Sequence, residues 1–404
     1  MSTVVIVGGG QGGFQTAASL RSGGHQGPIV LLADEPYRPY QRPPLSKGFV
    51  KDEVAQEALF FRKSDYFTAN DIDLRLETRV DRVDRAGKEV TTASGDRIAY
   101  DHLVLATGAR VRPLPVPGAD LSGVLYVRTL EDALELKARL HAGKRVVVVG
   151  GGFIGLEAAA VANELGCHVT VLEALDRLMA RVVPPLVSEF FLGLHREHGV
   201  DVRLGTVVSA VEGEGGRVTG VRLRDGTLLP ADLVIVGIGV LPNVELAAEA
   251  GLECRDGILV DELLRTSDPD IFAIGDCARF PHPSVEGPVR LESVQNALDQ
   301  GKAVAATILG EASPYSALPW FWSDQFHLKL QMAGLATGHD QTVLRGDPAA
   351  KSFSIFYYRA GEMVSVDSVN RPGDHMVARR LLTSGVAVSP EQAGDDGFAL
   401  KSLL

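Results

Sequence analysis

Cysteine is scarce in this sequence, and its arrangement excludes several kinds of chemistry. The chain of 404 residues has three cysteines, Cys167, Cys254 and Cys277, and none of them lies in a CxxC pair. An odd and sparse count is typical of a reducing cytosol and not of a disulfide framework. We therefore expect free thiols and a cytoplasmic protein.

Metal-ligand patterns are also missing. The ten histidines show no ligand spacing. His195 and His198 lie one helical turn apart without a third ligand, so we expect both on the surface of a helix and no bound metal.

No hydrophobic run is long enough to cross a membrane. The most apolar stretch, residues 146–162, is interrupted by four glycines and Glu157, and it is short for a bilayer. A buried strand followed by a helix explains it better. The N-terminus runs directly into a strand without a basic region, so no signal peptide is expected.

Basic residues are fewer than acidic ones, which gives a formal net charge of -11. This balance argues against nucleic acid as a partner, although a local basic patch for an acidic partner remains open. The length suits two or three domains.

Glycine is abundant, and it marks two similar turns. "VVIVGGGQGGF" at 4–14 places Gly8, Gly10 and Gly13 in a G-x-G-x-x-G pattern between a strand (4–7) and a helix (11–22). Such a turn lets a dinucleotide diphosphate approach the helix N-terminus. Asp34 ends the next strand (29–33) and can accept a ribose hydroxyl.

The second turn repeats this order. "VVVVGGGFIGL" at 146–156 places Gly150, Gly152 and Gly155 between a strand (145–149) and a helix (153–165). Glu173 ends the following strand, where a carboxylate binds a 2′-hydroxyl and repels a 2′-phosphate. This favours NAD over NADP, and the nearby Arg177 weakens the preference slightly.

The order of elements predicts an α/β protein with two Rossmann-like dinucleotide-binding domains, for FAD and NAD, and a small α+β C-terminal domain. Each nucleotide-binding half also carries a hairpin, at 88–100 and around "RDGT" (224–227). The proline-rich loop after Asp34 is expected to lack helix. The predicted domains are residues 1–110 with 243–314 (FAD), 111–242 (NAD) and 315–404 (C-terminal).

Further motifs resemble a known family. "ATGA" (106–109), "GIG" (237–239) and "IGD" (274–276) resemble marks of two-dinucleotide flavoprotein reductases with a glutathione-reductase-like fold. "RPPLSK" (42–47), "RTLEDA" (128–133), "GGGFIGLE" (150–157) and "WFWSDQ" (320–325) resemble ferredoxin reductases of the putidaredoxin-reductase and aromatic-dioxygenase type. The resemblance implies electron transfer from NADH through FAD to a 2Fe–2S ferredoxin. In such systems the ferredoxin feeds a haem monooxygenase of the cytochrome P-450 type or a ring-hydroxylating dioxygenase. It is also consistent with a monomer or weak dimer.

The resemblance also assigns roles to residues. For FAD it implies Gly8, Gly10, Gly12, Gly13, Asp34, Arg42, Lys47, Val80, Ala106, Thr107, Gly108, Arg128, Asp276 and Val294. For NADH it implies Gly150, Gly152, Phe153, Ile154, Gly155, Glu157, Glu173 and Gly239. Lys47, Glu157 and Trp322 are the implied catalytic residues.

Each of these three residues also has a simpler interpretation. Lys47 could be a solvated loop residue, and Glu157 a helix-surface acid. A charge within an apolar helix start is costly without a partner, which favours a pair for Glu157. Trp320 and Trp322 could be core residues, although Trp322 matches an aromatic side chain beside the flavin.

The absence of redox cysteines near the expected flavin site distinguishes this sequence from several enzyme classes that share the fold. Disulfide reductases carry a cysteine pair near the flavin, and peroxidases a single cysteine soon after the second strand, and neither is present here. A rubredoxin or monodehydroascorbate reductase, or an NADH-sensing flavoprotein like the apoptosis-inducing factors, stays open. Lys302 and Lys329 are candidates for a basic rim that steers an acidic ferredoxin.

Overall fold

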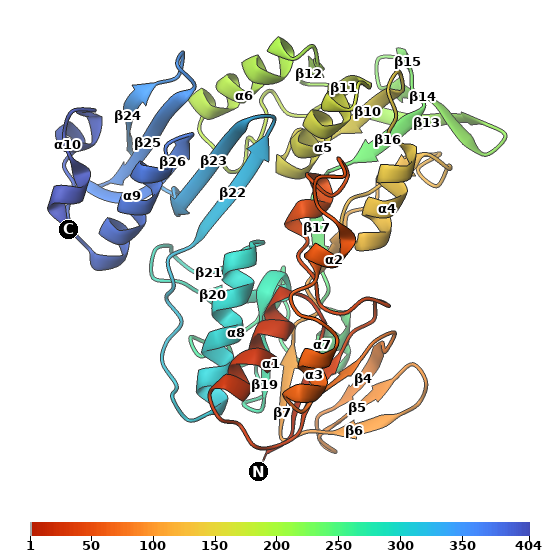
Figure 1. Cartoon of the computed structure of the whole chain (residues 1–404), viewed down its shortest axis with the longest axis vertical. Helices are drawn as coiled ribbons and strands as arrows, with labels where there is room; N and C mark the ends of the chain where they lie inside the picture. Colours follow the sequence, from red (N-terminus) through yellow and green to blue (C-terminus); the bar gives the residue numbers. More distant parts are fainter. Residues whose placement is uncertain (1) are drawn as a thin grey trace.

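The structure is a computed structural model that describes residues 2–404. Met1, the first position of the predicted FAD domain, lies outside the described residues. The chain forms an N-terminal unit, a second nucleotide-binding unit and a C-terminal unit, each with its own main sheet (Figure 1).

The N-terminal unit is built on a parallel sheet with the strand order β19-β7-β1-β2-β3. The four residues of its central strand, Val4–Val7, are all buried, as a parallel strand with covered faces requires. The chain returns to this unit after the second one, because β19 pairs with β7 and α8 packs on α1.

The main elements of this unit are β1 (Val4–Val7), α1 (Gln11–Ser22), β2 (Ile29–Leu32), β3 (Ile72–Arg75), β7 (His102–Leu105), β19 (Ile271–Ala273) and α8 (Val294–Ile308). Its smaller elements are the 3₁₀ turns η1 (Pro43–Ser46) and η2 (Gly275–Cys277), α2 (Gln56–Leu59), α3 (Asp65–Ala69), β4 (Val80–Asp84), β5 (Glu89–Thr92), β6 (Arg97–Ala99), α7 (Glu245–Glu249), β18 (Ile258–Leu259), β20 (Ala278–Pro281) and β21 (Pro288–Val289).

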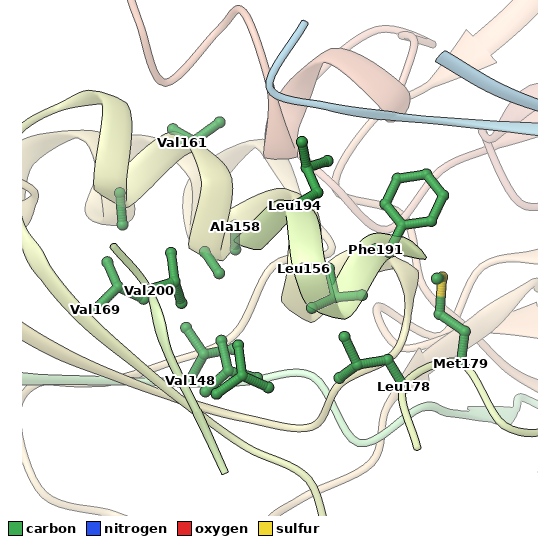
Figure 2. Packing of buried hydrophobic residues seen from close by; sticks show 14 of the residues in the cluster. Val148, Leu156, Ala158, Val161, Val169, Leu178, Met179, Phe191, Leu194 and Val200 are labelled. Atoms are coloured by element: carbon green, nitrogen blue, oxygen red, sulfur yellow. The ribbon is translucent and has the colours of Figure 1, made fainter. Parts of the chain in front are cut away.

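The second unit repeats the plan with the strand order β12-β11-β10-β16-β9. Figure 2 shows its core, in which Val148 and Val169 from the sheet face Leu156 of α5 and Leu194 of α6. Its elements are β9 (Val124–Leu125), α4 (Leu130–Arg139), β10 (Arg145–Val149), α5 (Phe153–Glu164), β11 (His168–Leu172), α6 (Pro185–Glu197), β12 (Asp201–Arg203), β13 (Val208–Glu214), β14 (Arg217–Leu223), β15 (Leu228–Pro230) and β16 (Leu233–Val236).

A short antiparallel ribbon joins the two nucleotide-binding units. It consists of β8 (Ala109–Val111) and β17 (Val240–Pro242). Next to it, the Asn243 side-chain amide donates to Thr107 O at 2.8 Å, and the Thr107 hydroxyl donates to Asn243 O at 2.7 Å. These paired bonds hold the outgoing and returning chains side by side.

The C-terminal unit is an antiparallel sheet with the order β22-β23-β26-β25-β24, covered by helices on one face. Its other face packs on the second unit, where the ring centroids of Phe353 and of Phe190 in α6 are 5.0 Å apart. Its elements are β22 (Trp320–Gln325), β23 (Leu328–Gly334), β24 (Gln341–Asp347), β25 (Ser352–Arg359), β26 (Glu362–Val369), α9 (Pro372–Ser384), α10 (Pro390–Gly394) and the 3₁₀ turn η3 (Leu400–Leu403).

The predicted fold class is confirmed, with one local correction. The proline-rich loop was expected to lack helix, but residues Pro43–Ser46 form a 3₁₀ turn. Proline is compatible with the first positions of a helical turn, where its missing N–H would have no partner in any case. This turn places Ser46 and Lys47 at the site described next.

Candidate active site

Both glycine turns have a backbone geometry that excludes other residues. Gly8 and Gly150 have φ of 119° and 110°. A Cβ at Gly8 would lie 2.1 Å from Ala106 O, and one at Gly150 would lie 2.4 Å from Gly237 O. Gly10 and Gly152 are the N-cap residues of the helices that follow, and in the described residues no side chain caps either helix. The first N–H groups of α1 and α5 are therefore free to bind an anion.

The two turns differ in the residue that follows the second strand. Val7 pairs with Leu32 and Val149 with Leu172, so Glu173 occupies the position of Ala33. The sequence interpretation placed Asp34 and Glu173 at equivalent positions, and the register shifts them by one residue.

The shift changes what each carboxylate can touch. The Glu173 carboxylate accepts hydrogen bonds from Gly151 N–H at 2.7 Å and Leu175 N–H at 2.8 Å. Asp34 is exposed at the edge of the first cradle. Arg177 does not face the second cradle, because it donates to Ala180 O and Val183 O and so braces the loop before α6.

A long cleft runs from the first glycine turn to the junction of the three units. Of the predicted site residues, those that line it are Gly8, Gly10, Gly12, Asp34, Arg42, Lys47, Ala106, Thr107, Gly108, Arg128, Ile154, Glu157, Asp276, Val294 and Trp322. These residues come from segments spread over more than 300 positions of the chain, and the fold brings them together.

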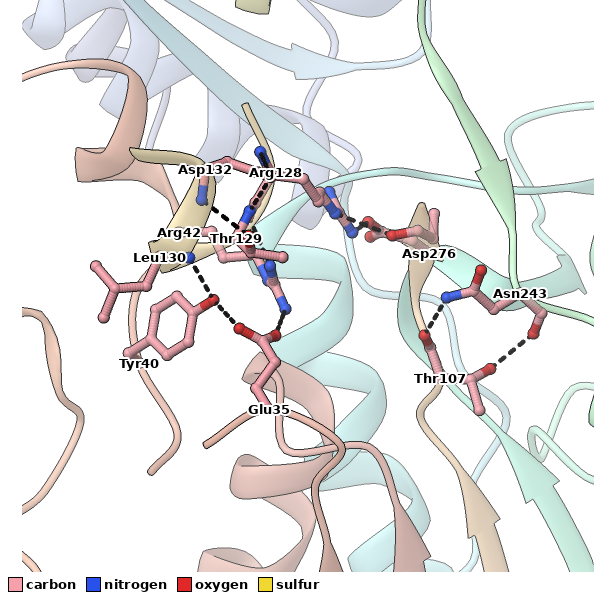
Figure 3. Close-up of polar contacts among 11 residues, drawn as sticks. Glu35, Tyr40, Arg42, Thr107, Arg128, Thr129, Leu130, Asp132, Asn243 and Asp276 are labelled. Atoms are coloured by element: carbon pink, nitrogen blue, oxygen red, sulfur yellow. Dashed lines mark hydrogen bonds and ion pairs between the residues drawn. The ribbon is translucent and has the colours of Figure 1, made fainter. Parts of the chain in front are cut away.

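The wall of the cleft is held by charged side chains (Figure 3). Arg42 donates to Glu35 at 2.6 Å, and the Tyr40 hydroxyl donates to the same carboxylate. Arg128 donates to Asp276 at 2.7 Å. Glu35 and Tyr40 were missed in the sequence, although both flank the proline-rich loop that supplies Arg42.

At the far end of the cleft, Lys47 and Glu157 form an ion pair with Nζ and Oε1 3.1 Å apart. Glu157 is only 3% exposed. It also accepts hydrogen bonds from the Ser46 and Ser323 hydroxyls, each at 2.7 Å. The interpretations of Lys47 as a solvated residue and of Glu157 as a surface acid are therefore wrong.

Burial is the main influence on this carboxyl group. It raises the pKa of Glu157, and Lys47 and the two serine hydroxyls act in the opposite direction by stabilising the charged form. Lys47 has a second neighbour in Asp324, at 3.5 Å. Ser46, Ser323 and Asp324 were also missed, although each adjoins a residue that the sequence motifs singled out.

Aromatic side chains close this end of the cleft. Trp322 lines it, with Lys47 Nζ 5.8 Å from its ring centroid. Trp320 lies beside Trp322, and the centroids of the two rings are 5.6 Å apart. The Arg379 guanidinium carbon lies over the Trp320 ring, 4.3 Å from its centroid. Trp320 is therefore packed beside Trp322 and does not line the cleft.

The remaining predicted residues lie outside the lining of the cleft. Gly13 packs under the first turn, and Val80 begins β4 close to Thr78, whose N–H donates to Ala33 O. The second turn contains Gly150, Gly152 and Gly155. The ring centroids of Phe153 and Phe321 are 4.8 Å apart. Gly239 precedes β17, with φ of 100°. Both lysines proposed for the basic rim, Lys302 and Lys329, are exposed. Lys329 Nζ lies 3.7 Å from Asp324 Oδ1.

The expectation for His195 is wrong. His195 is fully buried, and its Nε2 lies 3.0 Å from Gln325 Oε1. The helical spacing alone could not show this, because the covering surface comes from the C-terminal sheet. His198, one turn later, stacks on Phe326 at 3.9 Å.

The cysteines are all free, and Cys277 is buried, as expected for packing. Within residues 2–404 no group of His, Cys, Asp and Glu side chains is arranged to hold a metal ion. Among the helices described, none has the length and apolar character needed to cross a bilayer.

Two dinucleotide cradles that converge on a buried lysine–glutamate pair define a two-dinucleotide oxidoreductase. Comparison with known proteins agrees. Residues 2–301 match the pyridine nucleotide-disulphide oxidoreductase family, and residues 320–404 match the reductase C-terminal family. The chain therefore belongs to the pyridine nucleotide-disulphide oxidoreductase family.

Individual relatives match over nearly the whole chain. Rhodocoxin reductase from Rhodococcus erythropolis is 49% identical over 99% of this chain and 93% of its own. The crystal structure of a ferredoxin reductase from Rhodopseudomonas palustris is 50% identical, with a TM-score of 0.97 and 99% of each chain covered. The reductase in a covalent putidaredoxin reductase–putidaredoxin complex is 43% identical, with a TM-score of 0.97 and coverage of 100% and 98%.

Proposed function

We propose that the protein is an NADH-dependent ferredoxin reductase that carries FAD and delivers electrons to a 2Fe–2S ferredoxin. One observation carries the proposal. A single cleft runs from a diphosphate-type glycine turn to Lys47, Glu157 and Trp322, without a cysteine along its lining. Relatives named as reductases of ferredoxins support the choice of partner.

The first cradle and its cleft fit FAD. A diphosphate would sit at Gly8, Gly10 and Gly12, where the free N–H groups of α1 point outward. Space is open at Gly10, since a Cβ there would meet no atom within 4 Å in the described chain. Asp276 and Arg128 would hold the middle of the cofactor, and Asp34 the adenosine end.

The second cradle fits NADH. Glu173 already accepts a hydrogen bond from Gly151 N–H and retains lone pairs for a ribose hydroxyl. Its negative charge disfavours a 2′-phosphate, and Arg177 is occupied elsewhere. Bound FAD would supply chemistry that the side chains lack, namely the acceptance of an electron pair from NADH and the release of single electrons.

The chain's own residues position the reactants. The Lys47–Glu157 pair offers an ammonium and a carboxylate where the two cradles converge, which can orient a carboxamide between them. Trp322 and Phe321 line this end of the cleft with aromatic side chains. Trp322 also lies on the side from which electrons would leave toward a docked ferredoxin.

The physiological acceptor belongs to a monooxygenase or dioxygenase system under this proposal. The protein is then cytoplasmic, and Lys302 and Lys329 contribute to a basic rim for an acidic ferredoxin. Because Lys329 faces Asp324, we expect Lys302 to be the more effective of the two.

The test is electron transfer with purified FAD-loaded protein. NADH should bleach the flavin absorption within seconds, and NADPH should do so far more slowly. Reduction of a 2Fe–2S ferredoxin should then exceed reduction of a rubredoxin or of a small disulfide. Faster turnover with rubredoxin would assign the alternative acceptor, and rapid disulfide reduction would contradict the proposal altogether.

A further inference from the structure

A buried polar chain leads from the carboxylate of Glu157 to a histidine in the second unit. The Ser323 hydroxyl donates to Glu157 at 2.7 Å, and the Gln325 amide donates to Ser323 Oγ at 3.2 Å. Gln325 Oε1 in turn lies 3.0 Å from His195 Nε2. We propose that His195 is a positioning residue, which acts through Gln325 and Ser323 to hold the Glu157 carboxylate toward Lys47. This inference rests on the proposed function, because it gives Glu157 its role in reduction by NADH.

The Glu157 carboxylate at one end fixes the direction of every hydrogen bond in this series of side chains. An ionised carboxylate can only accept, so the Ser323 hydroxyl must donate to Glu157. The Ser323 oxygen is then free to accept from the Gln325 amide nitrogen. Gln325 therefore presents its carbonyl oxygen to His195, whose Nε2 must carry a proton. Each donor points toward Glu157, and no member can turn without leaving a bond unmade.

Complete burial makes this arrangement restrictive. His195, Gln325 and Ser323 are each 0% exposed. A buried donor or acceptor that loses its partner cannot turn to bulk water instead. The imidazole is wedged against Phe326 at 5.0 Å, and in the described part of the chain its Nδ1 has no hydrogen-bond partner. His195 therefore has a single polar task, which is to fix the Gln325 amide.

The imidazole is a neutral member of the chain. Burial lowers the pKa of His195 to about 4, so near neutral pH the ring carries one proton and no charge. The titratable and charged groups nearby are His198 for His195, and Lys47 with Asp324 beyond it for Glu157. The chain thus supplies orientation, while Lys47 supplies the charge.

The chain also crosses two interfaces. His195 and Glu157 belong to α6 and α5 of the second unit, and Gln325 and Ser323 belong to β22 of the C-terminal sheet. The same carboxylate accepts from Ser46 of the N-terminal unit. Glu157 is therefore oriented only when all three units are packed together.

The main variants are Gln325→Met, which keeps the volume and removes both hydrogen bonds, and His195→Phe. We expect each to slow flavin reduction by NADH about tenfold or more, through misplacement of Glu157, while the KM for ferredoxin stays unchanged. The pH profile of flavin reduction should shift to higher pH, because Glu157 loses a fixed donor and is harder to ionise.

The controls separate positioning from stability. His198→Gln alters the neighbouring histidine, which hydrogen-bonds Leu194 O and lies outside the chain, and it should leave the rate and the pH profile unchanged. Ser323→Ala should reproduce the Gln325→Met shift, and Ser323→Thr, which keeps a hydroxyl, should restore the wild-type profile. His195→Gln, which keeps a side-chain donor at this position, should retain the wild-type rate and pH profile; if His195→Phe fails to fold, Gln325→Met alone tests the loss of the bond.

A second readout does not depend on turnover. Infrared difference titration of the FAD-loaded protein should show a protonated carboxylic acid band that is absent in Glu157→Gln and moves to higher pH in Gln325→Met. Wild-type profiles in both Gln325→Met and His195→Phe would overturn the inference. If wild-type flavin is not reduced by NADH at all, the proposed function fails instead, and the infrared titration still decides whether the chain orients Glu157.

Discussion

Lys47 and Glu157 meet with Nζ and Oε1 3.1 Å apart, although they come from different nucleotide-binding units. Lys47 follows a 3₁₀ turn of the N-terminal unit, and Glu157 lies in the helix after the second glycine turn. The pair forms only where the two cradles converge. It therefore couples the relative position of the units to the site where the two dinucleotides would meet.

Lys47→Met should destabilise the protein strongly. Glu157 would remain buried without its cation, and breaking a buried pair in this way costs about 3–5 kcal/mol. Urea unfolding of the FAD-free protein at neutral pH measures the loss. Lys51→Met is the matched control, since Lys51 pairs with the more exposed Glu53 and Glu164. We expect that control to cost at most about 1 kcal/mol.

The cost of Lys47→Met should depend on pH. Burial already raises the pKa of Glu157 above its unfolded value, and removal of Lys47 raises it further. The folded variant then holds a proton that the unfolded chain releases. Its stability is therefore greatest below the unfolded pKa and falls as pH rises through the folded one. An equal loss at pH 5 and pH 8 would contradict this account.

Glu173→Arg should shift the coenzyme preference toward NADPH. The substitution removes a carboxylate that repels a 2′-phosphate and adds a cation that attracts one, so the ratio of kcat/KM for NADPH to that for NADH should rise about tenfold or more. Steady-state kinetics with both coenzymes measure the ratio. Asp34→Arg is the control, because Asp34 borders the first cradle. It should weaken FAD retention and leave the ratio unchanged.

The sequence predicts the parts of the site that follow local rules. Gly8 and Gly150 are recognisable because a positive φ and a close backbone contact both demand glycine. The strands and helices around them follow from buried β-branched runs and from the order of the motifs. Motif matches also find Lys47 and Glu157, whose spacing along the chain has no physical meaning by itself.

The parts that were missed depend on how the units pack. Glu173 and Asp34 look alike in sequence, and only the register of the parallel strands separates them by one residue. His195 reads as a surface residue because the C-terminal sheet that buries it lies more than 100 residues away. Tertiary packing of this kind leaves no local pattern for a single sequence to reveal.

Asp367→Asn should remove a pH dependence of stability. Burial raises the pKa of Asp367 to about 7, and its partner is the Tyr357 hydroxyl. The folded state therefore binds a proton between about pH 4 and pH 7 that the unfolded chain lacks, and wild-type stability falls by roughly 4 kcal/mol as the pH rises across that interval. Urea unfolding at several pH values should show a flatter profile for Asp367→Asn. Glu362→Gln, an exposed change on the same strand, should keep the wild-type slope.

Trp322→Ala should separate the two halves of turnover. Trp322 lines the cleft with its ring centroid 5.6 Å from that of Trp320, so its ring lies between the cleft and Trp320, over which Arg379 of α9 packs. We expect ferredoxin reduction to slow about tenfold, equivalent to about 1.4 kcal/mol in the barrier, and flavin reduction by NADH to change much less. Stopped-flow absorbance resolves the two steps. Trp320→Phe should affect neither step strongly, because it keeps an aromatic ring behind Trp322. If Trp322→Ala instead slowed both steps equally, its ring would serve as packing and not as the exit for electrons.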